Sequence, residues 1–223
     1  MTRLIKFTPG EYFHIYNRGT NKMNIFNNNL DYLRFQKLLF LVNSKKTLKY
    51  SDIETNQKSP SRTWTQERGE TLVDIGAYCL MPNHFHILIK SKNEKDTSVF
   101  LQRLLTSHSK YFNKKNNRSG SLFQGKSKSK HITENNYLKY IFSYIHLNPV
   151  KILYKNWRES ENINTKEIIN YLENFKYSSF IDYSNEMKRE ESCILNKSGF
   201  PNYFLSSKLF KKEIFDWLKI NNI

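Results

Sequence analysis

The sequence of 223 residues predicts an α+β protein built on one antiparallel sheet. Short aromatic or β-branched stretches are interleaved with longer stretches in which apolar residues recur every three or four positions. Hydrophobic residues make up 38% of the chain, which is enough for a buried core. No apolar run approaches the roughly 18–20 residues of a membrane span, so we expect no signal peptide and no membrane as a partner.

The first predicted strand covers residues 11–17, "EYFHIYN", and the first predicted helix covers residues 30–42, with Asn28 or Asn29 as its cap. The same criteria predict strands at 71–81 and 84–90 and a helix at 99–112. Residues 122–132 are expected to contain an exposed or edge strand. The last helix of this part is predicted at 134–147, with Thr133 as its cap and Pro149 at its end. The order β-α-β-β-α-β-α is that of a ferredoxin-like sheet, for which we expect helices packed on one face.

The chain divides by composition near residues 156–158. Residues 1–157 contain the predicted sheet and a long polar loop at 44–70, and residues 158–223 are expected to form a C-terminal helical extension. In the extension, "NTKE" at 164–167 predicts a capped helix, and residues 208–220 predict an amphipathic one. The two cysteines, Cys79 and Cys193, lack CxxC spacing, so we expect free thiols in a reducing cytoplasm.

Positive charge is concentrated before this division. The chain has a net charge of +16, and residues 1–158 hold 27 basic and 10 acidic residues, against 9 and 10 afterwards. Between Thr97 and Thr133 there is no Asp or Glu. A basic stretch of this kind predicts a nucleic acid as partner, although a lysine-rich composition alone would explain part of the excess. The candidate DNA contacts are Arg18, Arg103, Lys110, Lys114, Lys115, Arg118, Lys126, Lys128 and Lys130.

Two histidines, His84 and His86, stand two residues apart in the predicted strand "HFHILIK". Residues with this spacing point to the same face of a strand, so both imidazoles can reach one metal ion without bending the backbone. The alternative is a pair of solvent-facing polar residues, and the short pattern does not decide between them.

A predicted helix supplies further candidates. Asn148 follows Tyr144 by four residues, so both lie on one helical face. Asn148 could be a neutral third metal ligand or an ordinary helix end before proline. Tyr144 could be a nucleophile, but Tyr137 and Tyr140 share its apolar stripe, and the pattern does not choose among the three. We expect His146 to lie on the helix surface.

Five blocks occur in a specific order: "HIYNRGTNKMNIF" (14–26), "YCLMPNHFHILIK" (78–90), "GSLFQGKSKS" (120–129), "YIHLNPVK" (144–151) and "FKYSSFIDY" (175–183). Together they resemble the REP-associated tyrosine transposases, a group of the single-tyrosine HUH (His-hydrophobe-His) transposases. The resemblance implies an enzyme that cuts and rejoins single-stranded DNA with hairpin ends. It places the metal ligands at His84, His86 and Asn148 and the nucleophile at Tyr144.

The mechanism implied by the resemblance uses Mg²⁺ or Mn²⁺ and passes through a 5′-phosphotyrosine with release of a 3′-OH. Two other functions fit the fold: a noncatalytic module that binds single-stranded DNA or RNA, and a replication initiator or relaxase with the same HUH chemistry. The resemblance leaves open a monomer or a homodimer, the DNA sequence, and the role of the extension. We expect a cytoplasmic protein that acts at the nucleoid.

Overall fold

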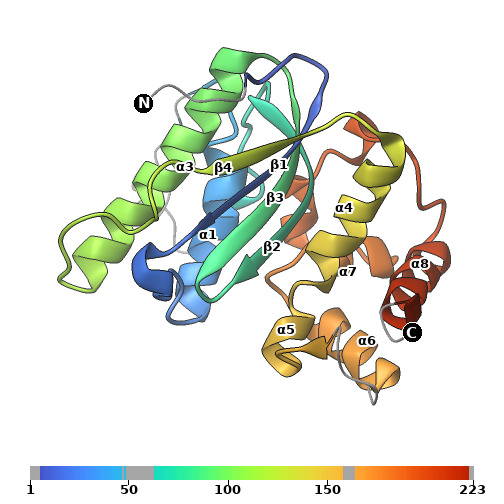
Figure 1. Cartoon of the computed structure of the whole chain (residues 1–223). Coiled ribbons are helices and arrows are strands. Elements are labelled where there is room, and N and C mark those ends of the chain that lie inside the picture. Colours follow the sequence, from blue (N-terminus) through green and yellow to red (C-terminus); the bar gives the residue numbers. More distant parts are fainter. Residues whose placement is uncertain (1–5, 47, 49–62, 158–163, 221–223) are drawn as a thin grey trace.

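A four-stranded antiparallel sheet with the strand order β2-β3-β1-β4 forms the centre of the molecule (Figure 1). The computed structural model describes residues 6–46, 48, 63–157 and 164–220. The strands are β1 (Tyr12–Arg18), β2 (Val73–Met81), β3 (His84–Ser91) and β4 (Lys128–Ile132). This order confirms the predicted ferredoxin-like arrangement, and β4 is the exposed edge strand that the lysines predicted.

Two helices of the split βαβ unit, α1 (Asn29–Leu41) and α3 (Glu94–Lys115), pack on one face of the sheet (Figure 1). The N-cap residue before each helix is an asparagine whose side chain accepts a hydrogen bond from a backbone N–H in the first turn: Asn28 from Asp31, and Asn93 from Asp96. Both helices are longer or shifted relative to the predicted ranges because local sequence does not fix helix ends well.

The helix α4 (Asn135–Leu147) lies on the opposite face, which differs from the expectation that the helices cover one face only. Residue burial explains the difference, because all nine residues of β2 are buried. Apolar side chains such as Cys79 and Leu88 point away from α1 and α3, and α4 covers them with Ile141 and Ile145. Thr133 does not cap α4, whose N-cap residue is Glu134 without a side-chain hydrogen bond.

The residues after 163 form the C-terminal helices around the end of α4 (Figure 1). Leu147 and Val150 pack with Ile168, Phe180 and Phe210 in one apolar cluster. The elements of this part are α6 (Thr165–Asn174), α7 (Phe180–Ser184), α8 (Ser207–Ile220) and the short 3₁₀ helices η4 (Glu190–Ile194) and η5 (Lys197–Gly199). Before it, α5 (Val150–Leu153) follows α4, and the 3₁₀ helix η1 (Thr20–Lys22) follows β1. Asn164 caps α6 as predicted.

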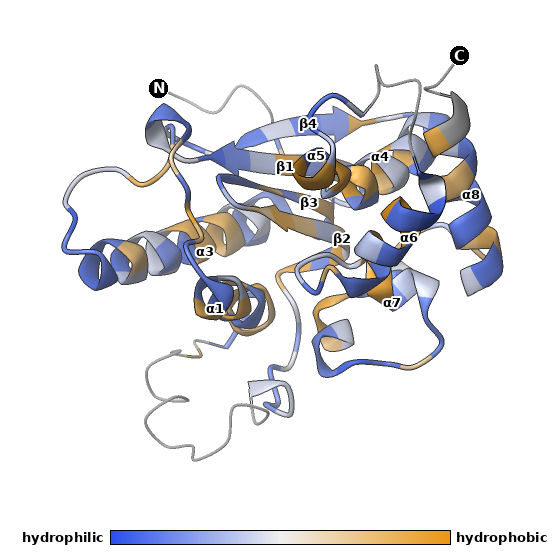
Figure 2. Ribbon diagram, turned by 90° about the horizontal axis from the view of Figure 1, so that it is seen from below, coloured by the Kyte–Doolittle hydropathy of each residue, from blue (hydrophilic) through white to orange (hydrophobic). Residues whose placement is uncertain are grey.

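The C-terminal part also covers the outer edge of β2. The backbone N–H of Leu80 donates to the Tyr177 carbonyl at 2.9 Å, and the N–H of Ser179 donates to the Tyr78 carbonyl at 2.9 Å. An exposed edge would offer its unpaired N–H and C=O groups to other chains, so this short pairing protects β2. Hydrophobic residues gather on the inner part of the sheet and on the helix sides that face it, whereas the edge strand β4 is mostly hydrophilic (Figure 2).

Most of the predicted polar loop at 44–70 lies outside the described residues. The predicted division between residues 157 and 158 falls at the start of another segment that is not described, residues 158–163. Among the helices that the structure describes, none has the length and apolar character needed to cross a membrane.

One buried histidine in the α1–α3 layer makes stability depend on pH. His108 is fully buried, and its Nε2–H donates to the Ile25 carbonyl at 2.8 Å. Burial lowers the pKa of His108 to about 4 from its ordinary value of 6.5. The unfolded chain therefore takes up a proton between pH 6.5 and 4 that the folded chain does not, so this contribution to stability is complete above pH 6.5 and is lost as the pH falls toward 4.

We expect His108→Gln, which retains an N–H donor for Ile25 but does not titrate, to flatten the fall in stability below pH 6.5. The lowered pKa of His108 corresponds to a loss of roughly 3 kcal/mol in the free energy of unfolding between pH 6.5 and pH 4. Urea unfolding at several pH values measures the effect. His131→Gln, at the surface of β4 beside Glu11, is the control, and an unchanged acid profile in His108→Gln would contradict the assignment.

Candidate active site

The pairing of β1 with β3 places four aromatic side chains on the sheet face that α4 covers. In the register, Tyr16 lies opposite His86, and His14 lies opposite Leu88. His14 and Tyr16 of β1 therefore share a face with His84 and His86 of β3, because residues two apart in a strand point the same way. The two imidazoles of the HxH pattern thus face α4 and not the core formed with α1 and α3.

A cavity of about 270 Å³ opens beside these side chains, at the end of β1 and the start of β3. Five of the predicted site residues line it: His84, His86, Tyr144, Arg18 and Lys128. Its other lining residues are Tyr16, Asn17, Gln124 and Lys151. The cavity therefore combines two imidazoles, a phenol and several cations, although these residues come from four separate segments of the chain.

The hydrogen bonds of His84 fix which of its ring nitrogens is free. The Asn83 amide nitrogen donates to the Lys22 carbonyl at 3.1 Å, so its Oδ1 is the atom that faces His84. His84 Nδ1–H donates to that oxygen at 2.6 Å. A neutral imidazole that donates from Nδ1 has its lone pair on Nε2, which leaves His84 Nε2 able to bind a cation.

Burial keeps the site imidazoles uncharged at neutral pH. It lowers the pKa of His84 to about 4, helped by the charges of Arg18 and Lys151, and it lowers the pKa of His14 to about 4, helped by Lys130. The pKa of His86 lies well below its ordinary value, mainly through burial. Because metal ions bind the neutral imidazole, the rings are held in the form that a metal ion requires.

Tyr144 is the tyrosine of its stripe that lines the cavity. Its ring meets those of His86 and His14 edge-on, with centroids 5.5 and 5.8 Å apart. Tyr140 packs against Trp217 of α8 at 5.1 Å, and Tyr137 receives the Lys130 ammonium over its ring at 4.3 Å. Helical periodicity puts all three on one stripe, whereas their position along the sheet separates them.

Asn148 is buried at the end of α4, with 1% of its surface exposed. Its Nδ2 donates to the Tyr144 carbonyl at 2.8 Å, and its Oδ1 accepts from Lys151 Nζ at 3.2 Å. Lys151 lines the cavity, and its Nζ lies 5.4 Å from the centroid of the Tyr144 ring. The Asn148 oxygen thus holds the Lys151 ammonium, and Asn148 is tied to the helix end beside the cavity.

The predicted DNA contacts fall into two groups. Arg18 and Lys128 line the cavity, and Lys126 and Lys130 are exposed nearby on the segment that leads into and through β4. The others belong to α3 or the turn after it, across the sheet from His84 and His86. Lys110 and Lys114 are exposed there. The other three bind within the protein: Arg103 donates to the Ser44 carbonyl, and Lys115 donates to Asp31. Arg118 donates to the Asn113 side chain and to the Ser121 carbonyl.

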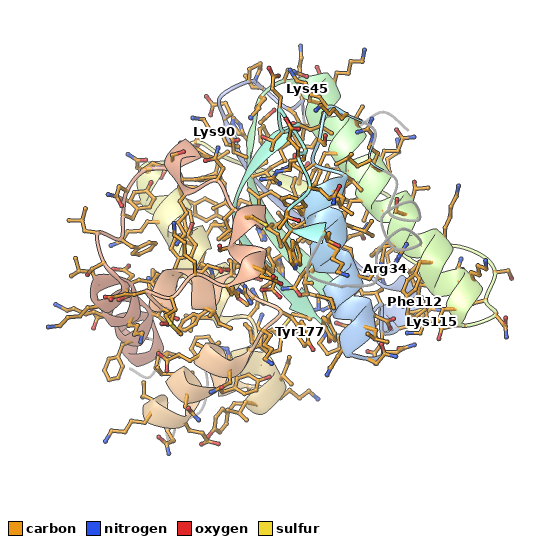
Figure 3. The ribbon with its side chains drawn as sticks, turned by 180° about the vertical axis from the view of Figure 1, so that it is seen from behind. Arg34, Lys45, Lys90, Phe112, Lys115 and Tyr177 are labelled. Carbon is orange, nitrogen blue, oxygen red and sulfur yellow. The ribbon has the colours of Figure 1, made fainter. Side chains whose placement is uncertain are left out.

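Intramolecular pairing weakens the case for part of the second group. Lys115 Nζ lies 2.5 Å from Oδ1 of the fully buried Asp31, and Figure 3 shows Lys115 and Phe112 where the end of α3 runs beside α1. A lysine already paired with a buried carboxylate adds little attraction for a phosphate. Phe112 beside it is buried in the core.

Several site residues were not found from the sequence: His14, Tyr16, Asn17, Gln124 and Lys151. His14 and Tyr16 alternate in a strand pattern, but only the β1–β3 register brings them to His86. His146 was expected at the surface, and this was wrong. It is completely buried, and its Nε2 lies 2.8 Å from Ser179 Oγ of the C-terminal part, which packs against this side of α4.

A divalent metal ion fits the donor set in part. His84 presents a free Nε2, and His86 lines the same cavity. In the portion of the chain that the structure describes, no three His, Cys, Asp or Glu residues gather into a metal-binding group. A metal held here would therefore depend on two imidazoles and on neutral or substrate oxygens. Of the two ions that the resemblance implies, such a mixed set favours Mn²⁺ over Mg²⁺, because Mg²⁺ prefers oxygen ligands alone.

Comparison with known proteins adds a family. A model of the family "Transposase IS200 like" matches residues 32–148, more than half of the chain, including His84, His86, Tyr144 and Asn148. No curated protein matches the chain. Among solved structures, a REP-associated tyrosine transposase bound to a REP hairpin is similar over 86% of this chain and 89% of that chain, with 13% identity and a TM-score of 0.47.

Proposed function

Because the chain belongs to the IS200-like transposase family, we propose that it cleaves and rejoins single-stranded DNA with Tyr144 as its nucleophile. The observation that carries the proposal is the cavity that Tyr144 lines together with His84, His86 and the cations Arg18, Lys128 and Lys151. A scissile phosphate fits such a cavity because the cations attract it and the phenol lies beside it. Hairpin-bearing DNA is the proposed substrate, since the sequence blocks resemble those of REP-associated tyrosine transposases.

In the proposed reaction, the Tyr144 oxygen attacks the phosphorus as the phenol releases its proton to solvent, the bond to the 3′ oxygen breaks, and that oxygen takes up a proton. The products are a 5′-phosphotyrosine and a free 3′-OH, and attack by a 3′-OH on the phosphotyrosine reverses the step and joins strands. Lys151 lies beside both Tyr144 and Asn148. Its ammonium is placed to stabilise the negative charge that develops on the phenol oxygen and on the phosphate.

His84 and His86 are the proposed metal ligands, with Asn148 as a third. A divalent cation, when bound, would polarise the scissile phosphate and favour attack on it. Asn148 Oδ1 accepts a hydrogen bond from Lys151. Its second lone pair is available to a ligand, but a metal ion bound there would be repelled by the nearby Lys151 ammonium. A phosphate in the cavity offers Lys151 a stronger, charged partner, and substrate binding would thereby free the Asn148 oxygen.

We further propose that residues 1–157 form the catalytic unit and residues 158–223 an extension that braces α4. The support is the packing of Leu147 and Val150, on either side of Asn148, against helices α6 and α8. The extension would hold the end of α4, and with it Tyr144, at a fixed distance from the sheet. Sedimentation of the protein with and without DNA distinguishes a monomer from a homodimer.

Tyr144→Phe is expected to abolish the covalent protein–DNA adduct, with a loss of on the order of a thousand-fold or more, because the attacking oxygen is removed. Denaturing gels with labelled hairpin DNA and Mn²⁺ measure the adduct, and a gel shift measures binding, which should be retained. Tyr140→Phe, one turn away against Trp217, is the matched control. An adduct in Tyr144→Phe would identify a different nucleophile, and its absence in the unchanged protein would favour a binding module.

His84→Ala is expected to weaken Mn²⁺ binding by on the order of 100-fold or more, because a ligand nitrogen is lost. Electron paramagnetic resonance of free Mn²⁺ measures the affinity without reference to cleavage. The control is His131→Ala, which removes an imidazole from β4 that stacks on Phe13 on the other face. Equal affinities in the two variants would exclude His84 as a ligand.

Lys128→Ala is expected to reduce the salt dependence of DNA binding. Loss of one phosphate contact should lower the slope of log K against log salt by about 0.7 for a single strand. Lys45→Ala removes an equal charge on the other side of the sheet, where Lys45 pairs with Glu70 at 2.5 Å. Fluorescence anisotropy at several salt concentrations compares them, and an identical slope change in both would show that net charge alone matters.

A further inference from the structure

We propose that His14 is a positioning residue that orients His86 and fixes the tautomer in which His86 can bind a metal ion. The inference rests on the proposed function, in which His86 is a ligand. His14 belongs to β1, more than 70 positions before its partner, and does not itself line the cavity. It would therefore act through His86 and not by touching the substrate.

The geometry joins the two rings directly. His14 Nε2 lies 2.9 Å from His86 Nδ1, and both side chains are buried. The ring planes differ by 27°, so the rings are nearly parallel, with centroids 5.0 Å apart. In the register, Tyr16 faces His86, which makes His14 its diagonal neighbour across the two strands. Aromatic side chains in diagonal positions are within reach of each other, so the backbone pairing itself produces the contact.

One proton lies between the two nitrogens, and its position decides whether His86 can bind a metal. If His86 donates from Nδ1, then its Nε2 carries the lone pair that a metal needs. If His14 donates from Nε2, then His86 accepts on Nδ1 and its Nε2 carries a hydrogen. Metal binding at His86 Nε2 therefore requires His14 to be the acceptor. A hydrogen bond from the distal nitrogen of a ligand histidine commonly sets ring orientation and tautomer in metal sites.

The same device is present at the neighbouring histidine. His84 Nδ1–H donates to Asn83 Oδ1, which leaves its Nε2 free. With His14 as acceptor, both histidines of the HxH pattern would present Nε2 to the cavity and Nδ1–H to a protein acceptor. His14 also meets the Tyr144 ring edge-on, with centroids 5.8 Å apart. The ring of His14 thus packs against both the proposed ligand and the proposed nucleophile.

Two substitutions separate the acceptor from the shape of the ring. His14→Phe retains an aromatic ring against His86 and Tyr144 but has no acceptor. His14→Gln loses the ring but can place an amide oxygen near the position of Nε2. Long-range ¹H–¹⁵N spectra of the histidine rings in the metal-free proteins report the His86 tautomer, and paramagnetic resonance of free Mn²⁺ reports affinity without DNA. Thermal unfolding confirms that each variant folds.

We expect His86 to carry its proton on Nδ1 in the unchanged protein and in His14→Gln. In His14→Phe we expect the Nε2–H form to gain population and Mn²⁺ affinity to fall by roughly 10- to 100-fold, while His14→Gln stays within a few-fold of the unchanged protein. A folded His14→Phe with the original tautomer and affinity would overturn the inference and leave the proposed function standing. If Mn²⁺ binding depends on His14 but the protein forms no tyrosine adduct with any DNA, the inference is supported and the proposed function is wrong.

Discussion

The antiparallel register of β1 on β3 is the constraint on which the candidate site depends. Phe13 and Ile15 of β1, together with Phe85 and Ile87 of β3, must face α1 and α3 to be buried. This requirement fixes the alternate residues on the other face. Because strand side chains alternate, a slip of one residue would exchange the two faces of a strand completely. The burial of four apolar side chains on one face therefore determines where the histidines lie on the other.

The other face is closed by a helix that has two tasks. α4 covers Cys79 and Leu88 of the sheet with its apolar residues, and it also presents Tyr144 at the point where this apolar cover ends. Beyond Asn148 the chain turns into α5, whose Lys151 bonds back to the end of α4. The C-terminal helices pack on Leu147 and Val150, so the position of the phenol relative to the imidazoles also depends on packing outside the cavity.

The charge of the molecule is arranged by pairing as well as by composition. The segment between Thr97 and Thr133 contains no acidic residue, yet some of its cations are bound within the fold, as Lys115 is to Asp31 of α1. The cations at the cavity come from three segments, including β1 and α5, which lie outside that stretch. Positive charge at the cavity also disfavours protonation of His84, so the field that would attract a phosphate also keeps this imidazole available for a metal ion.

The order of the elements, the shared face of His84 and His86, and the amphipathic helix that carries Tyr144 could be predicted from the sequence, because periodicity is a local property. The other features of the site depend on the tertiary fold. The strand register brings His14 to His86, the position of α4 along the sheet brings Tyr144 and not Tyr140 to the cavity, and the packing of the C-terminal part buries His146. His14 and His86, or His146 and Ser179, are distant in the chain, and Tyr144 and Tyr140 have the same local pattern. The positions of these side chains depend on which surfaces are buried together, so residue spacing alone does not predict them.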